Sequence, residues 1–277
     1  MENADILMLG ASGKVGRLMR AHWPGSGLRA IWHGRSLGAA PGWTGWQPGQ
    51  PLPDVPVVAL LAGVTAGAPE ALAENTRIGL AVAQAARQAG ARHVLLFSTM
   101  AVYGRTPAGD ATETAAPDRP NVYGLSKLAM EQAMTEALAG SGTGLTALRI
   151  GNVAGADLLG DRVARGLPIT LDRFAEGQGP VRSYAGPGLL VRVVRGLAGR
   201  VLDGRPLPAV LNVAGQRPVA MAELMQAAGL PFDWAEAGPN AIQRIAMDCR
   251  ALAALVPPQA DAETAAGVAA EWKAGIA

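Results

Sequence analysis

The chain has 277 residues, 49% hydrophobic and 17% charged, and its 24 basic and 22 acidic residues leave a formal net charge of +2. This is the composition of a globular protein, and it lacks the strongly basic balance that nucleic-acid binding needs. The single cysteine, Cys249, excludes an internal disulfide. No apolar run reaches the roughly 18 residues of a membrane-spanning helix, and the N-terminus has no signal-peptide pattern. We therefore expect a cytoplasmic protein with neither nucleic acid nor membrane as a partner.

Short apolar runs alternate with amphipathic stretches over the first 150 residues. Continuous apolar strands that alternate with helices indicate a parallel sheet covered on both faces. The predicted fold class is therefore α/β, a doubly wound parallel sheet. In chain order, the strands are DILMLG, LRAIWH, VPVVALLAG, HVLLFS and LTALRI, and the helices are KVGRLMRAHW, ENTRIGLAVAQAARQAG and a segment from Tyr123 to about Ala139.

Two regions are harder to assign. The interval from Ile31 to Asp54 lacks helix signals and is expected to be irregular, with room for a short strand in GWTGWQP. Residues 151–188 are rich in Gly and Arg. Beyond them we predict a helix at LLVRVVRGLA, a strand at AVLNVA, a helix at AMAELMQAAG and a helical tail from Ile242 to Ala277.

The first predicted strand runs into GASGKVG, in which Gly10, Gly13 and Gly16 are spaced G-x-x-G-x-x-G. Glycines at a strand-to-helix turn let a pyrophosphate approach the backbone, and the helix N-terminus supplies free N–H groups. The pattern predicts a dinucleotide site of the Rossmann type, the alternative being a tight turn without a ligand. A nucleoside-triphosphate P-loop is excluded, because Met8 and Val15 replace its first Gly and its Ser or Thr. The predicted cofactor-binding residues here are Gly10, Ser12, Gly13, Lys14, Val15 and Gly16.

The end of the second strand indicates which dinucleotide binds. An NAD site usually has an acidic residue about twenty positions after the glycines, to bind the ribose 2′-hydroxyl. Here no acidic residue occurs from Arg17 to Pro53, and the strand ends in WHGRS. Arg35 and Ser36 would bind a 2′-phosphate instead, which favours NADP over NAD; the alternative is a solvated surface Arg.

The stretch NVYGLSK places Tyr123 four residues before Lys127 at the start of a predicted helix. Residues four apart share one helical face, so a phenol and an ammonium would lie together. A tyrosine with its ordinary pKa of about 10 is a weak base at neutral pH, and a fixed cation favours the phenolate. The pair therefore suits proton transfer to and from a substrate oxygen.

GASGKVG, FSTMAVYG and NVYGLSK, in this order, resemble the extended short-chain dehydrogenase/reductases, the NAD-dependent epimerase/dehydratase family. The resemblance covers at least residues 5–155. It implies that Thr99 orients the substrate oxygen, that Tyr123 is the acid/base and that Lys127 also binds the nicotinamide ribose. It implies a structural role near the cofactor for Asn75. We also assign Leu61, Ala62, Gly63, Tyr123, Lys127 and Ile150 to cofactor binding.

We divide the chain into a dinucleotide-binding Rossmann domain, residues 1–150, and a mixed segment, residues 151–277. The second holds a small substrate lobe and pieces that return to the sheet. Thr99, Asn152 and Arg182 are the predicted substrate-binding residues, with Arg182 as an anion anchor or a surface ion pair. The AGPGLL that follows lacks the Val-Asp-Asp usual in the family, which puts the family's domain contact there in doubt.

The predicted activity is NAD(P)-dependent hydride transfer to or from a carbonyl or alcohol, with a sugar or nucleotide sugar among the substrates considered. Dehydratases of the family carry Asp-Glu after the catalytic Thr, whereas Met100 and Ala101 stand here. The alternatives are a nucleotide-sugar epimerase with retained NAD and a non-catalytic NADP-sensing module. A hydrolase is disfavoured because no G-x-S-x-G occurs, and scattered His and Cys residues predict no metal site. Many relatives dimerise through two helices equivalent to 74–90 and 123–139, so the resemblance suggests a homodimer.

Overall fold

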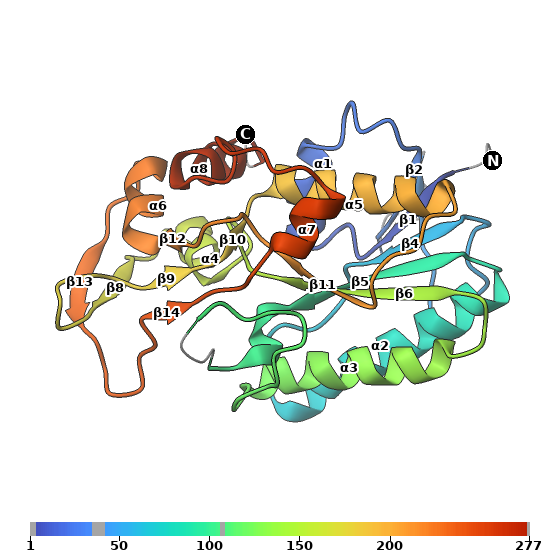
Figure 1. Cartoon of the computed structure of the whole chain (residues 1–277), viewed down its shortest axis with the longest axis horizontal. Helices are drawn as coiled ribbons and strands as arrows, with labels where there is room; N and C mark the ends of the chain where they lie inside the picture. Colours follow the sequence, from blue (N-terminus) through green and yellow to red (C-terminus); the bar gives the residue numbers. More distant parts are fainter. Residues whose placement is uncertain (1–3, 35–41, 106–108, 276–277) are drawn as a thin grey trace.

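The computed structural model describes residues 4–34, 42–105 and 109–275. A seven-stranded parallel sheet in the order β11-β6-β5-β4-β1-β2-β3 forms the centre of the molecule (Figure 1). This confirms the predicted doubly wound α/β fold. The strands are β1 (Ile6–Leu9), β2 (Ala30–His33), β3 (Trp43–Thr44), β4 (Val57–Leu60), β5 (His93–Thr99), β6 (Gly144–Ile150) and β11 (Val210–Val213).

Helices cover both faces of this sheet (Figure 1). On one side lie α1 (Lys14–Ala21) and α5 (Pro187–Leu202); on the other lie α2 (Pro69–Gln88) and α3 (Val122–Leu138). Successive strand side chains point to opposite faces: Ile6 and Met8 join the core under α5, while Leu7 and Leu9 join the core under α2 and α3. All four residues are buried, which explains why the strand sequence is continuously apolar.

Two local differences from the predicted elements have clear causes. The expected irregular interval contains β3, because Trp43 pairs in parallel with Trp32 of β2 and stacks under the guanidinium of Arg20, 4.6 Å from its ring centroid. Helix α2 starts at Pro69, five residues before the predicted Glu74. Proline is well suited to the first helical position, where its missing N–H has no intrahelical partner.

A smaller group of elements lies at the carboxyl end of the strands, around a third core that includes Leu159, Leu171, Tyr184, Leu224 and Trp272. Its strands are β7 (Asn152–Val153), β8 (Thr170–Arg173), β9 (Val181–Arg182), β10 (Tyr184–Ala185), β12 (Val219–Ala220), β13 (Asp233–Glu236) and β14 (Arg244–Ile245). Its helices are α4 (Leu158–Ala164), α6 (Met221–Ala228) and α8 (Ala265–Ala274).

The prediction of a continuous helical tail from Ile242 was wrong in part. Arg244 and Ile245 form β14, which pairs in parallel with β9. Helix α7 (Arg250–Leu255) ends before Pro257 and Pro258, which cannot continue a helix, and α8 starts only at Ala265. The apolar positions that suggested a helix are here divided between a strand and two short helices.

The start of α5 receives its cap from the far end of the chain. No acidic residue stands in AGPGLL, but Glu271 of α8 accepts hydrogen bonds from the amides of Gly188 (2.9 Å) and Leu189 (3.3 Å). Its other oxygen lies 3.3 Å from Arg192. The carboxylate thereby satisfies free N–H groups and the positive end of the helix dipole.

Within the described part of the chain, no helix has the length and apolar character needed to cross a membrane.

Replacing Gly16 by Ala is expected to destabilise the protein by about 1–3 kcal/mol or more, because overpacking forces backbone shifts. A Cβ at Gly16 would lie 2.5 Å from the Cα and carbonyl oxygen of Ala11. The matched control is Gly199→Ala in α5, where a Cβ meets nothing within 4 Å and should stabilise the helix by up to ~1 kcal/mol. Urea unfolding of both variants measures the difference. A Gly16→Ala protein as stable as wild type would contradict the close packing of α1 on the turn.

Candidate active site

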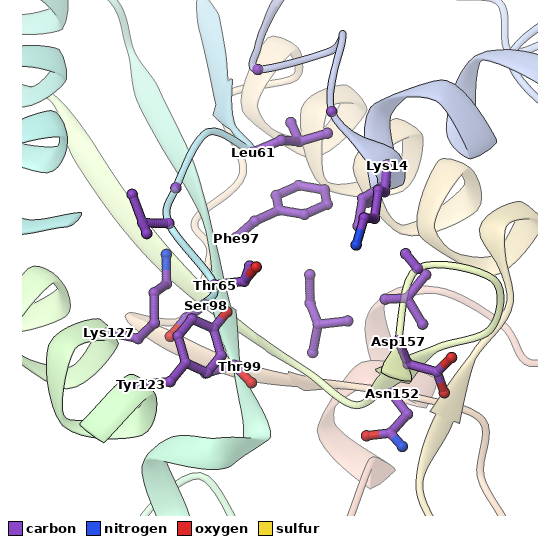
Figure 2. Close-up of a pocket in the computed structure, with 18 of the residues that line it drawn as sticks. Lys14, Leu61, Thr65, Phe97, Ser98, Thr99, Tyr123, Lys127, Asn152 and Asp157 are labelled. Atoms are coloured by element: carbon purple, nitrogen blue, oxygen red, sulfur yellow. The ribbon is translucent and has the colours of Figure 1, made fainter. Parts of the chain in front are cut away.

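A cavity of about 580 Å³ opens where β1, β4, β5 and β6 end (Figure 2). This edge is where open α/β sheets bind ligands. Most of the predicted site residues lie in its wall: Gly10, Gly13, Lys14, Val15, Gly16, Leu61, Gly63, Thr99, Tyr123, Lys127, Ile150 and Asn152. Sequence reasoning missed the other wall residues, among them Val64, Thr65, Ala66, Phe97, Ser98, Val153, Ala156, Asp157, Leu158 and Asp161.

The glycine turn forms one end of the cavity. Gly10 has a φ of +87°, and a Cβ there would lie 2.5 Å from the amide nitrogen of Ala62, so only glycine fits between β1 and β4. Gly13 is the N-cap of α1, and no side chain caps this helix. Its first N–H groups are therefore available for an anion. Lys14 extends from this turn across the cavity to Asp161 of α4, with 2.6 Å between Nζ and Oδ2.

Thr99 and Tyr123 meet because α3 packs very closely on the end of β5. Thr99 is the last residue of β5 and caps the short 3-10 helix η1 (Met100–Tyr103). Asn121 caps α3 by accepting a hydrogen bond from Gly124 N (2.8 Å), and a Cβ on Gly124 would lie 2.2 Å from the carbonyl oxygen of Ala101. This contact brings Tyr123 close enough to Thr99 for the threonine side chain to lower the pKa of the phenol.

Lys127 lies one turn further along α3, only 3% exposed, with its Nζ 3.2 Å from the sulfur of Met130. Burial lowers the pKa of Lys127 to about 8, and the carboxylate of Glu131 opposes this shift. Burial raises the pKa of Tyr123, opposed by the Thr99 hydrogen bond. Loss of solvent around the ring thus dominates the pKa of Tyr123 in this structure, and the effect expected of Lys127 together with a bound nicotinamide stays a prediction.

A buried ion pair supports this face of α3. Arg149 of β6 and Glu131 are 2.8 Å apart, and both side chains are less than 10% exposed. Ser98 of β5 donates a hydrogen bond to Glu131, and the Arg149 guanidinium lies 4.9 Å from the ring centroid of Tyr103. The pair ties α3 to β5, β6 and η1. Two sequence features could have indicated this ion pair: a Glu four residues after Lys127 and an Arg inside an apolar strand.

Asn75 fixes the loop after β4 next to Lys127. Its side chain accepts a hydrogen bond from the amide of Val64 (2.8 Å) and donates to the carbonyl of the same residue (2.9 Å). It also donates to Ser126 Oγ, 3.0 Å away. These bonds hold α2, α3 and the Gly63 loop together, as a structural role for Asn75 requires.

Across the cavity from Tyr123 and Lys127 lie Asn152 and Asp157 (Figure 2). Asn152 pairs with Tyr184 between β7 and β10, and the Tyr184 hydroxyl donates to Asp157 Oδ2 (3.1 Å). Asp157 also caps α4 by accepting from Gly160 N (2.9 Å). Burial raises the pKa of Asp157 to about 6, while these two hydrogen bonds favour its charged form.

Some predicted residues are not in the cavity wall. Arg182 donates to three main-chain carbonyls, those of Val181 (2.8 Å), Gln243 (2.9 Å) and Ile242 (2.8 Å). The Ser12 carbonyl accepts a hydrogen bond from Arg17, and the Ala62 amide donates to the carbonyl of Leu9. The roles predicted for these three residues stay predictions. Arg35 and Ser36 lie outside the described residues.

The family model described as "NAD dependent epimerase/dehydratase family" matches residues 55–192, about half of the chain. The chain belongs to this family. A UDP-glucose 4-epimerase of Streptomyces lividans is 36% identical over 104 residues, which cover 36% of this chain and 31% of that protein. One of Azospirillum brasilense is 39% identical over 95 residues, covering 34% and 27%. The chain thus matches only about a third of the length of these relatives.

Solved structures of the family agree with the fold over nearly the whole chain. A UDP-glucose 4-epimerase from Brucella ovis in complex with NAD has a TM-score of 0.78 at 17% identity and covers 96% of both chains. One from Thermus thermophilus, also in complex with NAD, has a TM-score of 0.70 at 22% identity and covers 97% of this chain and 99% of that one. At these identities the likeness establishes the fold.

Replacing Lys127 by Met is expected to stabilise the protein at pH 7 by on the order of 1–3 kcal/mol, because the native state disfavours a charge that the unfolded chain solvates. The folded pKa of about 8 lies below the ordinary 10.5, so the cost of Lys127 is full below pH 8 and disappears as pH rises toward 10.5. The stabilising effect should therefore shrink between pH 7 and pH 10.

Urea unfolding at several pH values measures this effect, with the exposed Lys273→Met as control. A Lys127→Met variant that is less stable than wild type at pH 7 would show that burial of the Lys127 ammonium does not lower the free energy of unfolding.

Proposed function

We propose that this protein is an NAD(P)-dependent oxidoreductase that transfers a hydride between the dinucleotide and a carbonyl or alcohol. The observation that carries the proposal is the meeting of Thr99, Tyr123 and the buried Lys127 in one cavity with the glycine turn of α1. A nucleotide cradle and a proton-transferring tyrosine are the two parts that carbonyl reduction needs from the protein.

The glycine turn fits a dinucleotide, because the first N–H groups of α1 lack a side-chain cap and because Gly10 and Gly16 let the turn pack directly against the backbone of Ala62 and Ala11. The main chain from Gly13 to Gly16 would hold the pyrophosphate, with Lys14 beside it. Leu61, Gly63 and Ile150 would contact the nicotinamide half, and Lys127 would donate to its ribose. When bound, the dinucleotide supplies or accepts the hydride.

The residues of the chain then control the proton. Thr99 Oγ1 hydrogen-bonds the substrate oxygen, and Tyr123 gives its hydroxyl proton to that oxygen as the carbonyl is reduced, or removes it in the reverse direction. Lys127 stabilises the phenolate that remains, since a nearby cation favours the charged form of a phenol. Asn152 and the small group of elements after residue 150 would bind the rest of the substrate.

NADP is the cofactor that we propose within this class. No acidic residue occurs from Arg17 to Pro53, and His33 at the end of β2 accepts a hydrogen bond from Gly10 N (3.2 Å). The end of β2 therefore lies beside the cradle. An Arg and a Ser at this point are suited to a 2′-phosphate.

Arg35→Ala should weaken NADPH binding by about 1–3 kcal/mol, because a hydrogen bond to a charged group typically contributes that much. NADH binding should be nearly unchanged. Fluorescence titration of purified wild type and variant with both reduced dinucleotides measures this, with exposed Arg87→Ala as control. Equal losses for both dinucleotides would refute the role of Arg35 at the 2′-phosphate.

A nucleotide-sugar epimerase with retained NAD is the second candidate, favoured by the curated relatives that carry that name. The same three residues would serve it, because epimerisation removes a hydride and returns it to the other face of the carbonyl. Absorbance of the purified protein separates the two: NAD that stays bound through purification favours the epimerase. A non-catalytic NADP-sensing module would bind NADPH and turn over no substrate.

We also propose a homodimer through α2 and α3. These helices expose Leu80, Val122 and Leu125 to solvent, at 42%, 57% and 51%. Large apolar side chains exposed on neighbouring helices are typical of an interface between subunits.

Tyr123→Phe should reduce kcat by at least about 100-fold, since general acid–base catalysis contributes roughly that much, and leave cofactor affinity within about twofold. Tyr103→Phe is a poor control, because that hydroxyl donates to the buried Asn212 (2.6 Å). The third tyrosine, Tyr184, contacts Asp157, so a surface change such as Trp234→Phe serves better. Steady-state kinetics and NADPH titration give the two readouts. Full turnover in Tyr123→Phe would remove the acid/base assignment.

A further inference from the structure

The charges in the cavity wall differ sharply between its two ends. Of the described residues in the wall, four are charged: Lys14, Lys127, Asp157 and Asp161. Lys127 is buried beside Tyr123, and Lys14 is already paired with Asp161. The end of the cavity at Asn152 and Asp157 therefore has no unpaired cation among the described residues and carries a carboxylate.

Asp157 is fixed in place by two hydrogen bonds that favour its charged form, while burial raises its pKa to about 6. The Gly160 amide binds Oδ1 at 2.9 Å, and the Tyr184 hydroxyl binds Oδ2 at 3.1 Å. Each carboxylate oxygen can accept a second hydrogen bond. Asp157 can thus receive a hydroxyl or ammonium group from a ligand without losing its own partners.

The arginine that would be expected to bind an anion is engaged elsewhere. The guanidinium of Arg182 donates to the carbonyls of Val181, Ile242 and Gln243, which join β9 to the segment before β14. Arg182 is absent from the cavity wall. A diphosphate placed beside Asn152 would therefore face Asp157 without a compensating cation, and like charges at close range strongly disfavour binding.

The size and the apolar part of the wall agree with a small ligand. About 580 Å³ is within the range that one drug-sized ligand fills, and here it would hold the pyrophosphate and the nicotinamide half of the cofactor together with the substrate. Val153, Ala156 and Leu158 line the same end, and Leu158 is 74% exposed at the cavity mouth. These residues offer apolar contact rather than hydrogen bonds.

We propose that this site takes a small uncharged or cationic carbonyl compound or alcohol rather than a nucleoside-diphosphate sugar, and that Asp157 binds its hydroxyl or ammonium group. The inference rests on the proposed hydride-transfer function. It separates this chain in substrate class from the UDP-glucose 4-epimerases that it resembles in sequence.

The binding experiment titrates UDP-glucose by calorimetry into wild type, Asp157→Asn and Asp233→Asn, each saturated with its preferred dinucleotide. Asparagine caps a helix as well as aspartate does, so Asp157→Asn should fold, and Asp233 is an exposed control on β13. We expect wild type to bind UDP-glucose with a Kd weaker than about 1 mM and Asp157→Asn to bind about tenfold tighter. Micromolar binding by wild type, or no gain in Asp157→Asn, overturns the inference.

The kinetic experiment compares three ketones that differ in charge: aminoacetone, dihydroxyacetone and dihydroxyacetone phosphate. We expect kcat/KM to fall in that order. In Asp157→Asn, the ratio of kcat/KM for aminoacetone to kcat/KM for dihydroxyacetone phosphate should be about tenfold smaller, and the change should lie in KM. An unchanged ratio, or turnover of the phosphate above the amine, contradicts the role of Asp157. A protein that binds neither NADPH nor NADH refutes the proposed function instead, and titration of the unloaded protein with UDP-glucose still decides the inference.

Discussion

The placement of a lysine inside the core, beside a tyrosine at the edge of the sheet, is the constraint on which this site depends. A buried ammonium is costly unless charged or polar groups compensate it. Here Glu131 lies one turn away, and Arg149 and Ser98 hold Glu131 in place. Burial nevertheless lowers the pKa of Lys127, because the carboxylate of Glu131 only partly offsets the loss of solvent around the ammonium.

The close approach of α3 to β5 follows from the same requirement. Tyr123 reaches Thr99 only because Gly124 lets the first turn of α3 touch the carbonyl of Ala101. Asn121 fixes that turn, and Asn75 fixes the loop opposite it. The catalytic geometry that we propose is thus held by backbone contacts and amide side chains rather than by the three reacting groups themselves.

Helix α8 joins parts of the chain that are far apart in sequence. Glu271 of α8 caps α5, and the carbonyl of the same residue lies 2.9 Å from Nε2 of His22, just after α1. Glu271 thus supplies an anionic group to a helix start that has no acidic residue in its own first turn. An anionic partner at this end of α5 is favourable, because the helix dipole is positive there.

The sequence by itself determined the sheet, most of its helices, the glycine turn and the Tyr123–Lys127 pair, because each has a local signature: apolar runs, glycine spacing and a four-residue spacing on a helix. Thr99 was assigned through the family resemblance. It also predicted a substrate-binding role for Asn152, which lies in the cavity wall. Only the tertiary structure decided that Arg182 turns to main-chain carbonyls, that Asp157 and Asp161 enter the cavity, and that β14 interrupts the predicted helical tail. These features arise from strand pairing and side-chain contacts between distant segments, and no local pattern records which partner a charged group will find.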